Sequence, residues 1–345
     1  MKVRDIGEKS LLERLQRFCP PEIVGDDAAV LAMQAGQSLV VTTDMLVDGV
    51  HFSDRTTSPE DAGWRAAAAN LSDLAAMGAT PLGITVALGL PGDVAVSWVE
   101  RLYHGMSECL QQYQTPIVGG DVCRSPVINI AITAFGQVEP LQAIRRSTAR
   151  VGDAIVVTGI HGASRAGLEL LLHPELGQNL SECDRNSLIQ AHQRPKPRLD
   201  VLPILWEILA SQSKIQNLEF KIQNPKSNIH VAGMDSSDGL ADAIVQICQM
   251  SGVGAIIEQS QIPLSVALKS LVSSEQAVEW GLYGGEDFEL VLCMRPQIAE
   301  ELVKHLGEKA AIVGAIAEAT EVILRDRTNE NPDQVLSLSR GFQHF

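Results

Sequence analysis

The stretch "VVTTDMLVDGVHF", residues 40–52, begins as an apolar run and then carries two threonines, two aspartates and a histidine. The β-branched and aliphatic run predicts a buried strand, which we place at residues 38–43. Thr42, Thr43 and Asp44 then lie at its end. Hydroxyl and carboxylate oxygens gathered at one point are the ligands that a hard divalent cation prefers. The stretch therefore raises the hypothesis of a metal site at a strand end.

Length and composition limit the classes of protein to consider. The chain has 345 residues, of which 45% are apolar and 20% charged, and its net charge is −15. A chain of this length predicts two domains, and the apolar fraction is typical of packed cores rather than disorder. The negative charge disfavours nucleic acid and anionic membrane as partners. Any anionic substrate must therefore be bound by local features.

The cysteines and the N-terminal segment predict a cytoplasmic protein. Six scattered cysteines without a C-x-x-C pair are typical of reduced thiols, and they favour neither a disulfide framework nor a zinc knuckle. The first 18 residues, "MKVRDIGEKSLLERLQRF", are charged throughout and lack the apolar core of a secretory signal. The uncharged run 74–92 contains glycines and prolines, so we interpret it as a helix end, a turn and a strand rather than a membrane span.

Further elements follow from periodicity and from turn residues. Ser58 as N-cap, Pro59 at the first position and Gly78 at the end predict a helix over 59–77, on which Asn70 and Asp73 share a face. Residues 211–230 are polar and predict a surface excursion or weak hairpin. The other expected strands lie at 82–90, 128–136, 154–158 and 310–316, and helices at 163–172 and 297–306; residues 231–252 predict a strand, an acidic turn and a helix closed by Gly252, and residues 283–294 a turn and a strand.

Six short acidic segments recur beside strands or glycines. Each alone is an ordinary turn, since Asp and Gly are the commonest turn residues and Asp238 would cap the helix that follows it. Six such segments with no lysine inside any of them favour convergence on one site, because acidic clusters usually hold a hard cation. The segments are "GDDAAV" (25–30), "TTDMLVDG" (42–49), "NLSDLAAMG" (70–78), "GGDVCRS" (119–125), "GMDSSDGL" (233–240) and "GGEDFEL" (284–290).

Clustered carboxylates repel one another unless cations are present. Mg²⁺ prefers carboxylate oxygen and takes its remaining ligands from water and substrate phosphates, so carboxylates without a basic cradle indicate a metal–nucleotide site. The sequence contains no G-x-x-x-x-G-K-[ST], no G-x-G-x-x-G that opens a helix after a strand, and no protein-kinase signature set. A nucleotide would therefore bind through another architecture.

The six segments, in this order and at these separations, resemble the thiamine-monophosphate kinase family. Its superfamily includes aminoimidazole ribonucleotide synthetase, selenophosphate synthetase and a hydrogenase maturation protein. The resemblance runs from about residue 5 to the C-terminus. It implies phosphorylation of thiamine monophosphate to thiamine diphosphate, with ATP as co-substrate and several Mg²⁺ ions. Ser236, where the family usually has an apolar residue, and the long 211–230 segment depart from the pattern, but neither removes a ligand.

The resemblance also implies a fold and an assembly. It predicts an α+β chain of two α/β domains. Residues 1–140 would form the N-terminal domain that binds ATP and metal and whose sheet pairs in a homodimer. Residues 141–345 would form a C-terminal α/β sandwich domain that completes the active site.

Site residues follow from the resemblance position by position. Asp44, Asp73, Asp121 and Asp238 are the expected catalytic residues. Taken alone, Tyr103 could equally be a core residue, Arg146 a solvated charge and Phe342 terminal packing. The expected metal ligands are Asp27, Thr42, Thr43, Asp44, Asp73, Asp121, Asp235 and Asp238; the expected ATP contacts are Tyr103, Gly120, Asp121, Arg146 and Ser237; and the expected substrate contacts are His51, Glu286 and Phe342.

The implied chemistry needs no catalytic base. A phosphate monoester has a second pKa of about 6, so its oxygen is already a nucleophile at neutral pH. In-line transfer then depends on positioning and on neutralising the charge of two phosphates. The thiazolium ring of the substrate is a fixed cation, for which the carboxylate of Glu286 and the aromatic face of Phe342 are suitable partners.

Other functions remain open on the sequence. Selenophosphate synthetase would need a reactive cysteine in a glycine-rich N-terminal segment, which "RFCPPEIVG" around Cys19 is not. The hydrogenase maturation relative would end in a cysteine-bearing tail, whereas this chain ends "SRGFQHF". A metal-dependent phosphohydrolase would use the same carboxylates without nucleotide, and a non-catalytic metal-binding or regulatory protein is the third alternative.

Overall fold

The computed structural model describes residues 1–345 except 22, 24–27, 220–229, 328–331 and 341–345. The described residues form two compact units. Unit 1 contains residues 1–74, 79–140 and 193–195, and unit 2 contains residues 75–78, 141–192 and 196–345. Each unit has its own mixed sheet and helices, so the predicted α+β class with two α/β domains is confirmed.

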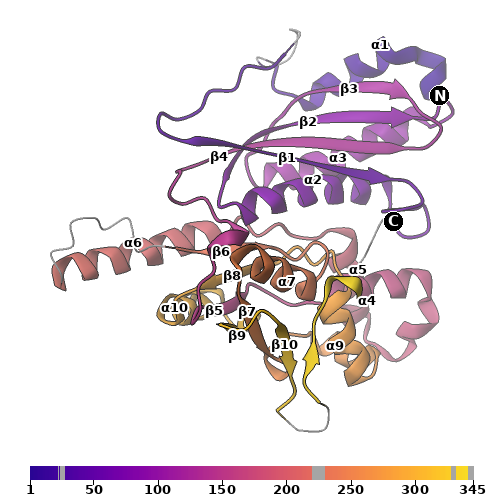
Figure 1. Ribbon diagram of the computed structural model, residues 1–345. Coiled ribbons are helices and arrows are strands. Elements are labelled where there is room, and N and C mark those ends of the chain that lie inside the picture. The colour runs from indigo at the N-terminus through magenta and orange to yellow at the C-terminus, as the bar shows by residue number, and fades with distance from the viewer. Residues whose placement is uncertain (22, 24–27, 220–229, 328–331, 341–345) are drawn as a thin grey trace. The chain divides into compact units, whose positions relative to one another are not determined.

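Unit 1 is built on a four-stranded sheet in the order β1-β4-β2-β3. β4 pairs antiparallel with both β1 and β2, and β2 pairs parallel with β3. Figure 1 shows α2 and α3 along one face of this sheet. The strands are β1 (Ser38–Val47), β2 (Thr80–Leu90), β3 (Ile117–Arg124) and β4 (Asn129–Val138), and the helices are α1 (Val3–Leu15), α2 (Pro59–Ala76) and α3 (Val96–Gln111).

One strand boundary and one turn predicted in unit 1 were wrong. β1 does not end at residue 43 but continues to Val47, because Thr42 to Val47 stay paired with β4. Residues 119–124 were predicted as an acidic turn, and they lie inside β3. Glycine and aspartate are depleted in strands, so the local signal at "GGDVCR" is weak, and the parallel pairing with β2 overrides it.

The helix predicted at 59–77 is confirmed as α2. Ser58 Oγ accepts a hydrogen bond from the Asp61 backbone N–H at 3.2 Å and donates one to the Asp61 carboxylate at 2.7 Å. Pro59 occupies the first helical position, where no backbone donor is needed. Gly78 follows the helix with a φ of +72°, the left-handed conformation that glycine adopts without steric cost.

Unit 2 is built on a seven-stranded sheet in the order β11-β10-β7-β9-β5-β8-β6. Every residue of β5 and β8 is buried, as expected for strands covered on both faces. α7 (Leu240–Ser251) packs on one face, and α6 (Val201–Glu219) with α10 (Pro296–Leu306) packs on the other (Figure 1). The strands are β5 (Ala154–Val157), β6 (Ala232–Asp235), β7 (Gly254–Glu258), β8 (Leu290–Met294), β9 (Ala311–Ala317), β10 (Val322–Arg325) and β11 (Gln334–Val335).

A third apolar cluster in unit 2 joins four further helices. Leu170 and Leu188 pack there against Leu268. The helices are α4 (Ala163–Leu172), α5 (Glu182–Gln193), α8 (Val266–Leu271) and α9 (Ser274–Tyr283). None of the helices in the described parts of the chain is long and apolar enough to cross a membrane.

The prediction of a surface excursion or weak hairpin over 211–230 was wrong for its first part. α6 continues to Glu219, and residues 220–229 lie outside the described residues. The sequence "SQSKIQNLE" is polar, but it contains neither glycine nor proline and is compatible with a helix. Polarity here is therefore no sign of a break in the helix.

His161, in the segment between β5 and α4, is fully buried. Its backbone N–H donates to the Pro263 carbonyl at 3.0 Å, and its Nδ1 lies 3.1 Å from the Gly159 carbonyl. Its Nε2 has no hydrogen-bond partner among the described residues. Burial lowers the pKa of His161 to about 4, although the bond to Gly159 acts in the opposite direction. The folded protein therefore keeps this imidazole neutral.

This burial predicts a loss of stability in acid. Between pH 6.5 and 4 the unfolded chain protonates His161 and the folded chain does not, so the free energy of unfolding falls as pH falls. From pH 6.5 to 5 the loss assigned to this residue is about 2 kcal/mol. We expect urea titrations to show that the native chain loses about this much more than His161→Leu over the same interval. Equal losses in the two proteins would refute the assignment.

Candidate active site

Two hydrogen bonds join four polar residues of β1 and α2 in unit 1. Thr42 and Asp44 are alternate residues of β1, so both face α2. Thr42 Oγ1 donates a hydrogen bond to the Asp73 carboxylate. The backbone N–H of Asp44 donates to Asn70 Oδ1 at 3.2 Å. We call Thr42, Asp44, Asn70 and Asp73 the β1–α2 cluster.

Asn70 is the member of this cluster that was not predicted as a site residue. It is fully buried, and its amide nitrogen donates to the Ala66 carbonyl at 3.0 Å, which fixes the orientation of the side chain. Its oxygen is thereby directed at the backbone of Asp44. The spacing of Asn70 and Asp73 on one helix face was visible in the sequence. The contact with Asp44 depends on how β1 packs on the helix, which no local pattern encodes.

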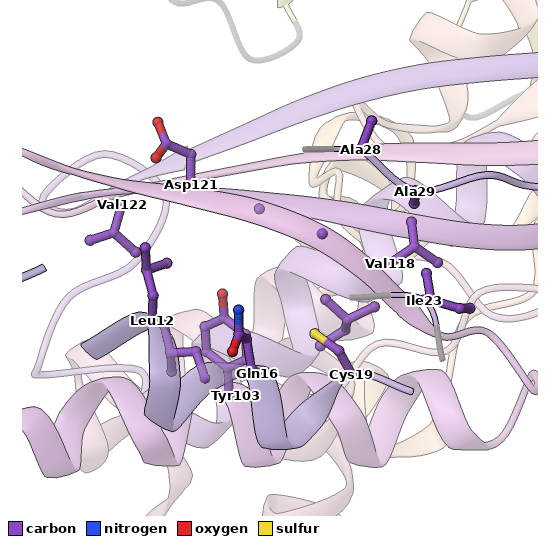
Figure 2. Close-up of a pocket in the computed structure, with 14 residues that line it drawn as sticks. Leu12, Gln16, Cys19, Ile23, Ala28, Ala29, Tyr103, Val118, Asp121 and Val122 are labelled. Carbon is purple, nitrogen blue, oxygen red and sulfur yellow. The ribbon is translucent and has the colours of Figure 1, made fainter. Parts of the chain in front are cut away.

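Thr43 and Asp121 lie on the opposite face of the same sheet. Thr43 pairs with Thr133 on β4, and the two hydroxyl oxygens are 2.7 Å apart. Asp121 pairs with Ala87 on β2 and is exposed. Figure 2 shows its carboxylate pointing away from the side of β3 where Leu12 and Tyr103 lie. The predicted ligands of unit 1 are thus divided between two faces of one sheet.

A cavity of about 180 Å³ lies beside β3 in unit 1. Tyr103, Gly120 and Asp121, three of the predicted ATP contacts, line it together with Gln16 and Cys19 (Figure 2). A side chain at position 120 would not fit, because its Cβ would lie 2.2 Å from the carbonyl oxygen of Val86 on β2. The glycine therefore keeps β3 close to β2 and leaves this wall of the cavity as bare backbone.

The groups around this cavity are mostly uncharged. Burial, with a smaller contribution from Cys19, raises the pKa of the Tyr103 phenol, so Tyr103 stays protonated. Burial also raises the pKa of the Cys19 thiol. The Tyr103 ring packs against Phe18 with the ring centres 5.4 Å apart. Such walls suit a flat, neutral group better than a phosphate.

His51 is fixed in the turn that follows β1. Its Nδ1 accepts a hydrogen bond from the Val47 backbone N–H at 3.0 Å, so the neutral ring carries its proton on Nε2. The buried guanidinium of Arg65 lies 3.5 Å from the His51 carbonyl oxygen. The predicted ligand Asp27 and the predicted substrate contact Phe342 lie outside the described residues.

The acidic turn after β6 carries three predicted site residues of unit 2. Asp235 is buried at the end of the strand, and Ser237 Oγ donates to its carboxylate at 3.1 Å. Asp238 is exposed. The N-cap of α7 is Gly239, so the reading of Asp238 as the cap of this helix is wrong.

Arg146 lies in the short helix η2 (Arg146–Thr148) of unit 2. Its guanidinium donates to Gln246 Oε1 at 2.5 Å, and the Gln246 amide donates in turn to the Asp242 carboxylate at 2.5 Å. These contacts hold an exposed arginine against the side of α7. The guanidinium has further N–H donors beyond the one that Gln246 accepts.

Glu286 lies in the turn that precedes β8. Its backbone N–H donates to the Ser237 carbonyl at 2.6 Å, so the predicted substrate contact and the predicted ATP contact in unit 2 are neighbours. Its carboxylate lies 3.6 Å from Nδ1 of the buried His192. The two acidic segments 233–240 and 284–290 therefore meet within unit 2.

Nowhere in the described residues do three His, Cys, Asp or Glu side chains gather closely enough to hold a metal ion. The predicted metal ligands thus stay a prediction. Their chemistry fits Mg²⁺, because the β1–α2 cluster presents hydroxyl and carboxylate oxygens in direct contact with one another.

Comparison with known proteins assigns the chain to a class. Residues 25–138 match the family described as AIR synthase related protein, N-terminal domain. The thiamine-monophosphate kinase of Synechococcus elongatus is 52% identical over 99% of this chain and 97% of its own length.

Solved structures extend this likeness to the fold. The crystal structure of the thiamine-monophosphate kinase of Stenotrophomonas maltophilia K279a covers 92% of this chain and 94% of its own, with 32% identity and a TM-score of 0.74. AaThiL complexed with AMPPCP and TMP covers 100% of this chain and 99% of its own, with 31% identity and a TM-score of 0.73.

The family match identifies residues 25–138 as an AIR synthase-related N-terminal domain. The identity to a named relative over nearly the whole chain is more specific. The chain belongs to the thiamine-monophosphate kinase family.

Proposed function

We propose that this protein transfers the γ-phosphoryl group of ATP to thiamine monophosphate and so forms thiamine diphosphate. The observation that carries the proposal is the 52% identity to a thiamine-monophosphate kinase over 99% of the chain. AaThiL, whose solved structure covers the whole of this chain, is complexed with TMP and with AMPPCP, an ATP analogue. The name of the Synechococcus relative supports thiamine monophosphate as the acceptor, and the AaThiL complex supports both thiamine monophosphate and ATP.

We assign the metal ligands as the family resemblance implies. All eight are oxygen donors, which suits Mg²⁺. When bound, Mg²⁺ would neutralise charge shared between the donor and acceptor phosphates. The chain's own contribution is to hold the donors, as Asn70 and Asp73 hold Asp44 and Thr42 in the β1–α2 cluster. The ligands are Asp27, Thr42, Thr43, Asp44, Asp73, Asp121, Asp235 and Asp238.

We assign the substrate contacts to both parts of the chain. In this proposal residues 1–140 bind ATP and metal, and residues 141–345 complete the active site. The mostly uncharged cavity beside Tyr103 and Gly120 supports binding of a flat base in unit 1. The contact between Ser237 and Glu286 supports a joint role in unit 2. ATP contacts are Tyr103, Gly120, Asp121, Arg146 and Ser237, and thiamine monophosphate contacts are His51, Glu286 and Phe342.

The proposed transfer is in line and needs no enzyme base. The terminal phosphate oxygen of thiamine monophosphate attacks the γ-phosphorus, the bond to the β–γ bridging oxygen breaks, and ADP leaves. The acceptor is largely dianionic above pH of about 6, so no proton has to be removed during attack. The residues of the site bind and orient the two phosphates.

The acceptor distinguishes this proposal from its alternatives. With ATP and Mg²⁺, we expect thiamine diphosphate from thiamine monophosphate and no product from free thiamine, whose hydroxyl would have to lose a proton during attack. Chromatographic product analysis of the purified protein measures both. Excess chelator should abolish the conversion.

Two outcomes would defeat the assignment. Efficient conversion of free thiamine would require a base that the proposal omits. ATP hydrolysis indifferent to either acceptor would favour the metal-dependent phosphohydrolase.

Asp44 tests the metal-binding role in unit 1. Asp44→Asn keeps the shape of the side chain and its backbone hydrogen bond to Asn70, but it removes the charge. We expect kcat to fall by at least about a hundredfold with an unchanged melting temperature, the scale of losing one strong electrostatic contact in the transition state. Asp48→Asn, an exposed aspartate beyond the same strand, is the matched control and should retain activity. Near-normal turnover of Asp44→Asn would make Asp44 a structural residue.

We propose that the chain forms a homodimer through the face of the four-stranded sheet opposite α2 and α3. Leu39, Val41 and Met45 of β1 are 52%, 52% and 53% exposed on this face. These three side chains lie on one face of β1 with Thr43 between Val41 and Met45, and they form an apolar stripe that a second copy of the sheet could bury.

Sedimentation equilibrium tests this assembly. We expect the native protein at twice the chain mass of 37.1 kDa. Val41→Glu places a charge in the proposed interface and should shift the protein toward the monomer, because a buried unpaired carboxylate is strongly disfavoured. Met250→Glu, at an exposed position of α7, should leave the mass unchanged. A native monomer, or a Val41→Glu dimer of native affinity, would contradict the proposal.

A further inference from the structure

The turn that carries Glu286 has an unusual backbone. Gly285, Glu286 and Phe288 have φ values of +67°, +58° and +52°. Among the described residues, Gln114 is the one other non-glycine residue with a positive φ. Left-handed backbone in non-glycine residues is uncommon and costly, and it persists where the surroundings hold it in place. Some contact must therefore fix this turn.

Asp287 lies between the two left-handed residues and makes that contact. Its carboxylate accepts hydrogen bonds from the backbone N–H of Gly162 at 2.6 Å and of Ser164 at 2.9 Å. These are free donors at the start of α4, whose own N-cap, Gly162, has no side chain to accept them. A charged acceptor at a helix N-terminus is favoured by the helix dipole as well as by the hydrogen bonds. Asp287 thus caps a helix more than 120 residues away in the sequence.

The first turn of α4 also reaches the side chain of Glu286. Ser164 Oγ lies 3.3 Å from His192 Nδ1, and the same nitrogen lies 3.6 Å from Glu286 Oε2. Ser164 and His192 are 1% and 2% exposed. α4 and α5 approach closely here, since a Cβ on Gly167 would lie 2.1 Å from the Leu188 carbonyl oxygen. Residues 286 and 287 are therefore both tied to the N-terminal end of α4.

We propose that Asp287 is a positioning residue: by binding the N-terminus of α4 it holds the left-handed turn that directs the Glu286 carboxylate at the substrate. This rests on the proposed function, in which Glu286 contacts thiamine monophosphate. The side chain of Glu286 is 35% exposed and so can reach a ligand. Without the bond to α4, nothing at Asp287 opposes relaxation of the flanking residues toward negative φ, which would turn the Glu286 side chain elsewhere.

The electrostatic environment of Asp287 is consistent with this specialised role. Burial raises the pKa of Asp287 to about 7, the carboxylates of Glu289 and Glu286 add to the rise, and the two N–H donors oppose it. A partly buried carboxylate beside two others is retained at a cost, and its hydrogen bonds to α4 compensate for that cost. An asparagine of the same shape has a single acceptor oxygen and cannot satisfy both donors.

Asp287→Asn tests the proposal by its effect on the KM for each of the two substrates. We expect the KM for thiamine monophosphate to rise by about tenfold or more, because one backbone donor is left unsatisfied and the turn relaxes. The KM for ATP should stay within about twofold. Ser181→Ala removes a helix-capping contact of similar kind, from the Asp184 N–H at 3.1 Å, and should change neither constant. A melting temperature lowered in Asp287→Asn with both KM values unchanged would make Asp287 merely structural.

A double-mutant cycle shows whether Asp287 acts through Glu286. Glu286→Gln should itself raise the KM for thiamine monophosphate. In that background Asp287→Asn should add less than about twofold, because the carboxylate that it positions is absent. Full additivity of the two effects would overturn the proposal.

Hydrogen exchange provides a readout that does not depend on the reaction. Peptides covering residues 160–166 and 284–290 should exchange at least about tenfold faster in Asp287→Asn than in the native protein, and Ser181→Ala should match the native protein there. Unchanged exchange would overturn the proposal whatever the activity. A native protein inactive with thiamine monophosphate would instead overturn the proposed function and the substrate role of Glu286, while exchange would still decide whether Asp287 holds the turn.

Discussion

The alternation of side chains along β1 governs the arrangement of polar groups in unit 1. Neighbouring residues of a strand point to opposite faces, so Thr42 and Asp44 face α2 while Thr43 between them faces the other side. The pairing of β1 with β4 fixes this choice, and a slip of one residue would exchange the two sets. Asn70 and Asp73 of α2 are placed to receive only the first set. The geometry of the site thus depends on strand register.

Unit 2 contains a strained turn, the one that carries Glu286, and other contacts must hold it. A non-glycine residue in the left-handed region costs on the order of 1 kcal/mol or more, and the Glu286 turn contains two. One helix cap contributes a comparable amount, so a single contact would not suffice. The Glu286 N–H bonds the Ser237 carbonyl, and Glu289 forms an ion pair with the largely buried Arg198 at 2.5 Å. Contacts on both sides of Asp287 therefore stabilise the turn together with the helix cap.

Features specified by neighbouring residues could be predicted from the sequence. The ends of α2 follow from Ser58 and Gly78, and the end of α7 follows from Gly252, which has a φ of +68°. Features specified by distant partners could not. β3 contains glycines and an aspartate that read as a turn, and it becomes a strand by pairing with β2. The role of Asp287 depends on Gly162 and Ser164, which no local pattern links to it.

The split of the proposed ligands between two faces also constrains how a second copy would bind in the proposed dimer. Met45, Ala131, Ala87 and Asp121 form one row across the face opposite α2, from β1 at one edge of the sheet to β3 at the other. Three strand spacings separate the ends of this row by about 14 Å. Burying the apolar β1 end is favourable, whereas burying the Asp121 carboxylate without a cation or water would be costly. In the proposed dimer, a pairing centred on β1 would cover Leu39, Val41 and Met45 together with Thr43 between them. Of the two proposed ligands on this face, it would leave Asp121 at the open margin of the sheet.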